Sequence, residues 1–244
     1  MFSDEGQGRP FLLLHGGGGP RTVAGFARLL SERARVVTPV HPGFGGTPRP
    51  ADLTDIRGLA HLYLDLLDDL DLRDVTVIGN SIGGWIAAEM GAAGSDRVTG
   101  VVLVNAVGLE SPNHRVVDVF PLAPAELAAL SFHDPAGFTL DPAAMTGAQL
   151  TAAKANREAL ATYAGTAMTD PTLRDRLRGT SVPTLVLWGE SDRVVTPDYG
   201  REYAEAIPGA EFRLLPNTGH VPQVETPDAL LAEVWAFATG QPAR

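Results

Sequence analysis

Short runs of β-branched and leucine residues alternate along this chain with longer amphipathic segments, and this alternation constrains the fold more than any other feature. The runs are apolar throughout, which is typical of parallel strands whose two faces are both covered. The amphipathic segments are long enough to be the crossover helices that parallel strands require. The sequence therefore predicts a three-layer α/β fold with a mostly parallel sheet of about six strands, at residues 11–15, 35–40, 75–79, 98–105, 183–189 and 211–215.

The segments between these runs carry the spacing of amphipathic helices. In residues 55–71, apolar side chains recur at three- and four-residue intervals, at Ile56, Leu59, Tyr63, Leu67 and Leu70. Such a pattern places them on one face of a helix. The other helices predicted in this way span residues 23–31, 82–93, 198–207 and 227–238.

Residues 110–179 interrupt the alternation. No convincing strand occurs there, only short helical patterns at 124–130 and 149–163. A structureless connection of that length is implausible in a compact domain, so we expect an inserted helical cap. The predicted division is a core formed by residues 1–109 and 180–244 and a helical cap formed by residues 110–179.

The composition excludes several classes of protein. Of 244 residues, 44% are hydrophobic and 20% charged, which supports a packed core rather than disorder. The 19 basic and 29 acidic residues give a net charge of −10, which repels nucleic acids and anionic membranes. The absence of cysteine excludes disulfides, thiolate metal sites and a cysteine nucleophile. No membrane-length apolar run and no secretory signal pattern are visible, so we expect a cytoplasmic protein.

A motif with chemical meaning follows the third predicted strand, where residues 79–84 read Gly-Asn-Ser-Ile-Gly-Gly and open a predicted helix. In a Gly-x-Ser-x-Gly pattern, a tight strand-to-helix turn lifts the serine hydroxyl out of the sheet, and small residues on both sides avoid clashes. The alternative is a glycine-rich helix start that Ser81 merely caps. The strand–turn–helix setting favours Ser81 as a nucleophile.

A serine hydroxyl needs a base within hydrogen-bond reach near neutral pH. Of six histidines, His220 follows the last predicted strand, where catalytic groups of open parallel sheets gather. The base needs an acid that orients its ring. Asp192 follows the strand at 183–189 and is our choice for that acid, with Glu190 as the fallback. The chain order Ser81, Asp192, His220 supports their assignment as nucleophile, acid and base.

Four glycines, residues 16–19, follow His15 directly after the first predicted strand. Backbone without side chains can approach a developing oxyanion, and one such amide donor stabilises it by about 3 kcal/mol. We expect the amides of Gly17 and Ile82 to form an oxyanion hole. The rival interpretation, a phosphate cradle, lacks the Gly-Lys-Ser/Thr sequence of a nucleotide-binding loop. No cofactor and no metal site is expected.

Together these motifs resemble the α/β-hydrolase superfamily over nearly the whole chain. The matching segments are residues 15–17, 41–47, 79–84, 188–192 and 219–220. The resemblance implies an α/β-hydrolase fold in which Ser81 is the nucleophile, Asp192 the acid and His220 the base. It also implies that residues 110–179 are a cap domain, inserted after the strand that ends at Asn105.

Two departures from the family pattern stand out. Members usually have two further strands before the segment that contains His15, yet only fourteen residues precede it here. The first hairpin is therefore expected to be missing or vestigial, which leaves residues 35–40 as a sheet edge. We expect the amino-terminal segment or a partner chain, such as a second copy in a homo-oligomer, to cover that edge. The other departure is His41, where the family often has aspartate.

The expected reaction is cleavage of a carboxylic ester or related acyl bond of a small, hydrophobic substrate through an acyl-enzyme. The motif at 79–84 also looks like the elbow of carbon–carbon bond hydrolases that cleave ring-fission products, in which Arg157 could hold a substrate carboxylate. However, Val221 stands where those enzymes often have tryptophan, and residues 21–30 contain no asparagine. Lactone or thioester cleavage, perhydrolysis and a non-catalytic small-molecule binding role also stay open.

Overall fold

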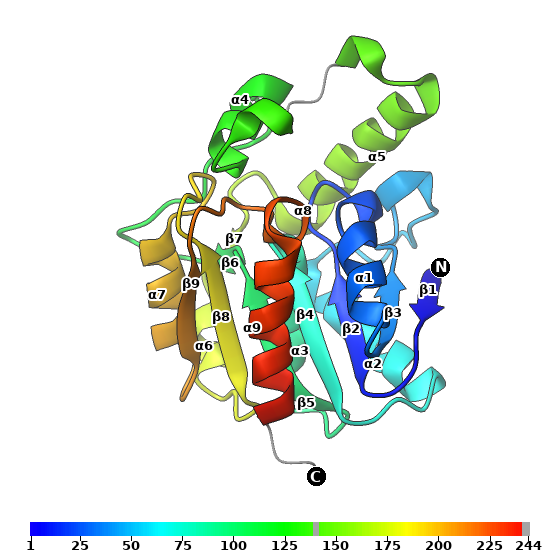
Figure 1. The fold of residues 1–244 in the computed structure, drawn as a ribbon, viewed down its shortest axis with the longest axis vertical. Helices are drawn as coiled ribbons and strands as arrows, with labels where there is room; N and C mark the ends of the chain where they lie inside the picture. The colour runs from blue at the N-terminus through cyan, green and yellow to red at the C-terminus, as the bar shows by residue number, and fades with distance from the viewer. Residues whose placement is uncertain (139–141, 241–244) are drawn as a thin grey trace.

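The computed structural model describes residues 1–138 and 142–240. Within these residues, seven strands form one sheet in the order β1-β3-β2-β4-β5-β8-β9, with helices on both faces, so the molecule has three layers (Figure 1). The predicted α/β architecture is confirmed. The strands are β1 (Phe2–Glu5), β2 (Pro10–Leu14), β3 (Arg35–Pro39), β4 (Val75–Asn80), β5 (Val98–Val104), β8 (Thr184–Gly189) and β9 (Glu211–Leu215).

Six of these strands run parallel, and they are the six apolar runs predicted from the sequence, with bounds that differ by at most one residue at each end. Each strand lies beside its partner without reversal of direction, so the carboxyl ends of all six share one edge of the sheet. This edge is at the top in Figure 1. Loops that follow different strands are thereby brought together, although they lie far apart along the chain.

The amino-terminal segment forms the seventh strand, which confirms that it covers the edge at residues 35–40 and adds one strand to the six predicted. β1 pairs antiparallel with β3, with Glu5 opposite Val36. β3 is therefore not a bare edge, because the chain's own first residues cover it, and one strand of the first hairpin is present. Both carboxylate oxygens of Asp4 accept hydrogen bonds from the Arg35 guanidinium, at 2.7 and 2.9 Å. Pairing of two copies through a sheet edge stays a prediction, and it would now involve β1.

Alternate side chains of each central strand pack on opposite faces of the sheet, which explains why the strands are apolar throughout. In β2, Phe11 and Leu13 belong to one buried cluster, with α1 and α9. Leu12 and Leu14 belong to the other, with α2, α3 and α7. The bounds of these helices are α1 (Ala24–Ser31), α2 (Ile56–Asp69), α3 (Ile82–Ala92), α7 (Pro197–Glu205) and α9 (Pro227–Gly240). No helix in the described part of the chain is long and apolar enough to cross a membrane.

Between β5 and β8 the chain is mostly helical. The elements between β5 and β8 are, in order, β6 (Gly108–Leu109), α4 (Pro124–Ser131), η3 (Pro135–Gly137), η4 (Pro142–Ala144), α5 (Gly147–Ala164), β7 (Thr169–Asp170) and α6 (Leu173–Leu177). α4 and α5 lie beyond the carboxyl ends of the strands (Figure 1). β6 and β7, each two residues long, pair in parallel as a separate small sheet that the sequence patterns did not predict. By contrast, α6 packs against α3 and buries Leu173 and Leu177 completely.

The predicted cap at 110–179 therefore contains one helix, α6, that packs with the core layers. Residues 139–141 of the predicted cap and 241–244 of the predicted core lie outside the described residues, and the boundaries of the cap stay a prediction. Three short helices occupy loops at the carboxyl edge of the sheet: η1 (Pro20–Thr22), η2 (Phe44–Gly46) and α8 (Pro222–Glu225).

Deletion of residues 2–5 removes β1 and exposes the hydrogen-bonding edge of β3. We expect the variant to lose about 2 kcal/mol, or roughly 5 °C in Tm, because several strand hydrogen bonds worth about 1 kcal/mol each disappear. We also expect it to self-associate through the bare edge, as measured by sedimentation velocity. The control is Asp4→Asn, which keeps the strand, breaks a half-exposed ion pair, and should cost about 1 kcal/mol or less. A monomeric deletion variant with the parent Tm would contradict this expectation.

Candidate active site

The candidate residues predicted from the sequence all follow strands at the carboxyl edge of the sheet. Ser81 follows β4, and the glycine loop that contains Gly17 follows β2. Asp192 lies in the loop after β8, and His220 lies in the loop between β9 and α8. The structure thus gathers all four segments at one edge.

Ser81 occupies a strained turn between β4 and α3. Its φ of 57° and ψ of −117° place a non-glycine residue in a region that is sterically costly for an L-amino acid. The turn is tight because a Cβ on Gly79 would lie 2.0 Å from the carbonyl oxygen of Gly83, and one on Gly83 would lie 2.4 Å from that of Leu14. Glycine is therefore required at both positions. A tight strand-to-helix turn of this kind is the setting in which a serine hydroxyl is lifted out of the sheet.

Asp192 and His220 are in direct contact. The Nδ1 atom of His220 lies 2.7 Å from Oδ2 of Asp192, which is 2% exposed. The other oxygen of Asp192 accepts hydrogen bonds from the amides of Val194 at 2.8 Å and Val195 at 3.0 Å. Since a carboxylate only accepts, His220 carries a proton on Nδ1, and Nε2 is the nitrogen left to act as a base. Glu190, the fallback acid, is exposed and accepts from the amide of Asn217 instead.

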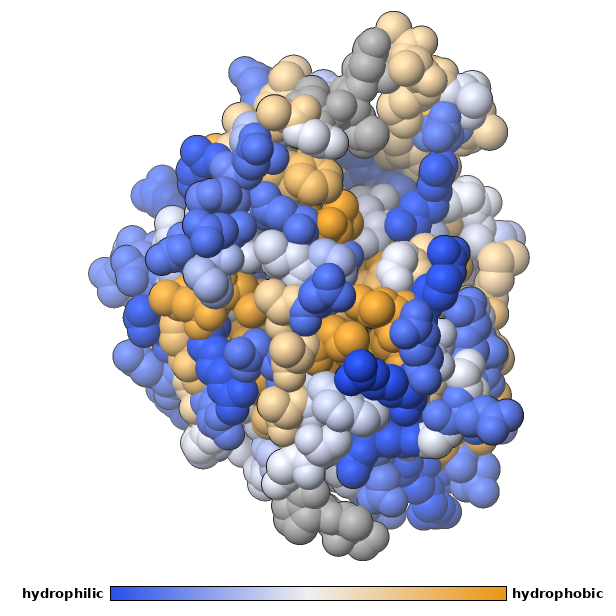
Figure 2. All heavy atoms as spheres, in the orientation of Figure 1, coloured by the Kyte–Doolittle hydropathy of each residue, from blue (hydrophilic) through white to orange (hydrophobic). Residues whose placement is uncertain are grey.

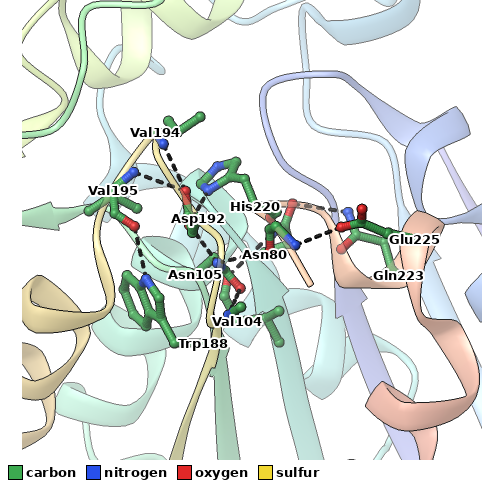
Figure 3. Close-up of polar contacts among 12 residues, drawn as sticks. Asn80, Val104, Asn105, Trp188, Asp192, Val194, Val195, His220, Gln223 and Glu225 are labelled. Atoms are coloured by element: carbon green, nitrogen blue, oxygen red, sulfur yellow. Dashed lines mark hydrogen bonds and ion pairs between the residues drawn. The ribbon is translucent and has the colours of Figure 1, made fainter. Parts of the chain in front are cut away.

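A buried asparagine that sequence reasoning missed completes the environment of Asp192. Asn105 follows β5 with a φ of 48° and is fully buried. Its Nδ2 donates to Oδ2 of Asp192 and, at 3.4 Å, to the carbonyl of Gly219, while its Oδ1 accepts from the amide of Gly189 at 3.3 Å. The sequence feature that could have identified Asn105 is its position directly after a predicted strand, which the other candidate residues share. Asn105 therefore joins the acid loop to the histidine loop (Figure 3).

The turn that carries Ser81 is hydrogen-bonded to the backbone of His220. The side chain of Asn80, the residue before Ser81, donates to the carbonyl of His220 at 2.9 Å and to that of Val104 at 3.2 Å (Figure 3). Within residues 1–138 and 142–240, no hydrogen bond joins Ser81 Oγ to the His220 ring. Catalytic hydrogen bonds of this kind commonly tighten only when substrate binds. The ring of His220 thus contacts Asp192 directly, and the carbonyl of His220 is hydrogen-bonded to the side chain of Asn80 in the turn that carries Ser81.

The glycine loop after β2 lies against Ser81. A Cβ on Gly16 would be 3.2 Å from the Cβ of Ser81. The amide of Gly17 donates to no acceptor in the part of the chain that the structure describes. Ile82 is the first residue of α3, where amides have no partner within the helix. Neither amide has an acceptor among the residues that the structure describes, which is what the predicted oxyanion hole requires.

Two buried histidines, His15 and His41, hold the base of this glycine loop. The amide of His41 donates to Nε2 of His15 at 3.1 Å, so His15 carries its proton on Nδ1 and donates it to the carbonyl of Gly16 at 2.8 Å. Nε2 of His41 donates to the carbonyl of His15 at 2.9 Å, and Nδ1 lies 2.6 Å from the hydroxyl of Tyr63, from which it accepts. Both rings are therefore neutral. Burial lowers the pKa of His15 to about 4, and burial together with His15 lowers the pKa of His41 well below its usual value.

Helix α5 covers the glycine loop at residues 16–19 and a second glycine-containing loop at residues 43–46. A Cβ on Gly17 would lie 2.9 Å from the side chain of Leu160, which is almost fully buried. Asn156 donates to the carbonyl of Gly18 at 3.0 Å and accepts from the amide of Gly45 at 2.7 Å. Arg157 is exposed and lies over the ring of Phe120, with its guanidinium carbon 5.6 Å from the ring centre. Among the described residues, no group of three or more His, Asp or Glu side chains could hold a metal ion.

A family model described as the alpha/beta hydrolase family matches residues 11–234. The chain belongs to this family, and it is an enzyme of the hydrolase class. The sheet order, the strained serine turn and the paired Asp192 and His220 agree with that assignment.

Several characterised proteins are similar over nearly the whole chain. The 2-hydroxymuconate semialdehyde hydrolase of Pseudomonas putida is 29% identical in an alignment of 252 positions, gaps included, that covers 91% of this chain and 84% of the relative. The crystal structure of the enol-lactonase from Burkholderia xenovorans LB400 matches with a TM-score of 0.80 and 26% identity, over 98% of this chain and 96% of that one. A thermophilic esterase from Thermogutta terrifontis matches with a TM-score of 0.77 and 26% identity, over 98% and 93% of the two chains.

The neutral histidines make stability depend on pH. Unfolded histidine has a pKa of about 6.5, whereas the pKa of His15 falls to about 4 in the folded protein. Below pH 6.5 the unfolded chain therefore binds protons that the folded chain does not, and stability falls as the pH falls from 6.5 to 4. From His15 alone, we expect the free energy of unfolding to drop by about 2 kcal/mol between pH 7 and pH 5.

Urea unfolding at the two pH values measures this loss. The exposed His61 supplies a control, because His61→Gln should leave the drop unchanged. Ring-nitrogen NMR gives a direct check, in which His15 stays neutral at pH 5. A free energy of unfolding that is constant between pH 7 and pH 5 would rule out the buried neutral pair.

Proposed function

We propose that the protein is a serine hydrolase that cleaves a carboxylic ester, or a related acyl bond, of a small hydrophobic substrate through an acyl-enzyme. The observation that carries the proposal is the 2.7 Å contact between Nδ1 of His220 and the buried Asp192, beside a serine held on a strained strand-to-helix turn. Ser81 is the nucleophile, His220 the general base and Asp192 the acid that orients the ring.

The steps follow from the positions of these groups. Nε2 of His220 removes the proton from Ser81 Oγ as the oxygen attacks the substrate carbonyl. The amides of Gly17 and Ile82 donate to the oxyanion of the tetrahedral intermediate, each worth about 3 kcal/mol. His220 then returns its proton to the leaving group. Water activated by His220 hydrolyses the acyl-enzyme and restores Ser81. None of these steps needs a cofactor.

The segment that contains α4 and α5 acts in this proposal as the cap that shapes the substrate pocket. Leu160 presents an apolar side chain beside the amide of Gly17, so the group next to the reacting carbonyl meets a hydrophobic surface. Figure 2 shows hydrophobic atoms at the surface between α4 and α8, with Val224 of α8 37% exposed. These features support a hydrophobic substrate. A cytoplasmic location, and the lack of nucleic-acid or membrane partners, stay predictions from composition.

A second candidate is hydrolysis of a carbon–carbon bond, with lactone hydrolysis as a third. The similarity to a 2-hydroxymuconate semialdehyde hydrolase and to an enol-lactonase supports them, as does the Gly-Asn-Ser-x-Gly-Gly turn. Against the carbon–carbon reaction, Val221 follows His220, and Arg157 lies over Phe120. The similarity to an esterase supports the first proposal. A non-catalytic binding role is disfavoured because every group of the hydrolytic machinery is present.

The nucleophile is tested by Ser81→Ala. We expect kcat/KM for p-nitrophenyl butyrate to fall by at least about 1,000-fold, because binding and oxyanion donors alone retain only a small part of the rate. A serine-directed phosphonate should label Ser81 in the parent protein, as shown by peptide mapping. The matched control is Ser31→Ala at the exposed end of α1, which should keep both activity and labelling. Full esterase activity in Ser81→Ala would refute the assignment.

The reaction is tested by a substrate panel measured on the parent protein. We expect kcat/KM to be higher for p-nitrophenyl acetate and butyrate than for a vinylogous dienoate ring-fission product or a simple lactone. Each activity should disappear in Ser81→Ala, which separates the site from contaminants. A dienoate that is cleaved faster than the esters would replace ester cleavage with the carbon–carbon reaction.

A further inference from the structure

Three successive peptide groups around His220 are each held by named hydrogen bonds. In the peptide between Thr218 and Gly219, the carbonyl accepts from the amide of Ser191 at 2.8 Å, and the N–H donates to Glu225 at 2.6 Å. In the next peptide, the Gly219 carbonyl accepts from Asn105, as described above, and the His220 N–H donates to the carbonyl of Ser131 at 2.6 Å. The carbonyl of His220 accepts from Asn80.

These bonds fix the direction of the His220 side chain. Peptide groups are planar, so the backbone can change only through the torsions at each Cα. When the planes on both sides of a Cα are held, those torsions are held as well, and the Cα–Cβ bond points in one direction. The partners of residues 218–220 therefore set the position of the His220 Cβ, from which the side chain reaches Asp192.

Two of the groups that hold residues 218–220 belong to the end of α4 or are hydrogen-bonded to the segment that follows it. The His220 amide donates to Ser131, the last residue of α4. Glu225 lies at the end of α8. Its Oε2 accepts from the backbone amide of Gly219, and its Oε1 accepts from the backbone amides of His133 and Asp134, at 2.7 and 3.2 Å. One carboxylate thus joins the histidine loop to the segment that follows α4.

The backbone approaches closely enough here that only glycine fits. A Cβ on Gly219 would lie 2.1 Å from the carbonyl oxygen of Ser131 and 2.8 Å from the Cα of Phe132. In addition, the amide of Arg193, next to Asp192, donates to the carbonyl of Leu130 at 3.1 Å. The end of α4 is therefore hydrogen-bonded to the acid loop as well as to the histidine loop.

From this arrangement we infer that Glu225 is a positioning residue, which places the His220 imidazole and couples that placement to the segment after α4. In the view of Figure 3, Glu225 lies on the other side of the His220 loop from Asp192. Asp192 orients the ring through its Nδ1 atom, and Glu225 orients the backbone that carries the ring. The inference rests on the proposed function, because it assigns His220 as the base.

The chemistry of the site requires a carboxylate rather than an amide. Both oxygens of Glu225 accept from N–H groups, and a charged acceptor makes such bonds roughly twice as strong as a neutral one. Glutamine has the same shape, but one end would be an NH2 group facing an N–H donor. Glu225→Gln can therefore satisfy the histidine loop or the segment after α4, but not both.

The test compares Glu225→Gln and Glu225→Ala with the matched control Glu205→Gln, which changes an exposed glutamate on α7. We expect kcat for p-nitrophenyl butyrate to fall about 10-fold in Glu225→Gln and about 100-fold in Glu225→Ala, since a shift of about 1 Å in a catalytic group can cost about 100-fold. KM should change less than kcat. Glu205→Gln should match the parent.

Two readouts separate positioning from a general loss of stability. The NMR signal of the proton on His220 Nδ1, which lies far downfield when the Asp192 hydrogen bond is tight, should broaden or move upfield in Glu225→Gln. The phosphonate labelling rate of Ser81 should fall with kcat in samples whose thermal unfolding shows that they are folded. If Glu225→Ala does not fold, Glu225→Gln decides.

The outcomes separate this inference from the proposed function. If the parent protein is labelled at Ser81 but folded Glu225→Gln keeps the parent kcat and the parent Nδ1 proton signal, the positioning role is wrong and the hydrolase proposal stands. If Ser81→Ala keeps full activity, the proposed function fails, and the Nδ1 proton signal still reports whether Glu225 places the ring.

Discussion

The buried carboxylate of Asp192 is the group on which the arrangement of the site depends. Burying an ionised carboxylate is costly unless its oxygens are hydrogen-bonded, and four N–H groups supply those bonds: the amides of Val194 and Val195, Nδ2 of Asn105 and Nδ1 of His220. These donors come from three segments of the chain. The carboxylate is therefore stable only when the acid loop, the end of β5 and the histidine loop are all in place, which makes the site and the fold depend on each other.

The parallel sheet makes this convergence possible, and the backbone at its edge completes it. Ser81 and Asn105 directly follow the neighbouring strands β4 and β5, and both have positive φ values, 57° and 48°. Such conformations cost about 1 to 3 kcal/mol and persist only where surrounding contacts hold them. Here the amide of Ser81 donates to Val104, and the amide of Asn105 donates to Leu187 of β8. These conformations turn the chain sharply at both strand ends, and at the second end the Asn105 side chain reaches Asp192.

Sequence reasoning reached the strands and the groups at their ends, because each of these groups follows an apolar run that ends at a glycine or polar residue. It gave the amino-terminal segment as one of two candidates to cover β3 but did not predict β1 as a strand. The residues Ser3, Asp4 and Glu5 are polar and lack any apolar alternation, since an edge strand exposed to solvent has no face to bury. It also missed Asn105, whose partner Asp192 is 87 residues away. The roles of Glu225 and of the end of α4 were equally hidden, because backbone hydrogen bonds between distant segments leave no residue pattern.

Three buried histidines, His15, His41 and His220, lie around this edge of the sheet, yet only His220 is suited to act as a base. In His15 and His41, both ring nitrogens are already engaged, one donating and one accepting, inside a site where burial lowers their pKa values. They can neither gain nor give up a proton without breaking the bonds that hold the glycine loop. His220 uses only Nδ1, and no partner in the described residues takes its Nε2. An imidazole with one nitrogen held by a carboxylate and the other free is what proton transfer from a serine requires. The hydrogen-bond partners, rather than the residue type, therefore decide which histidine can do chemistry.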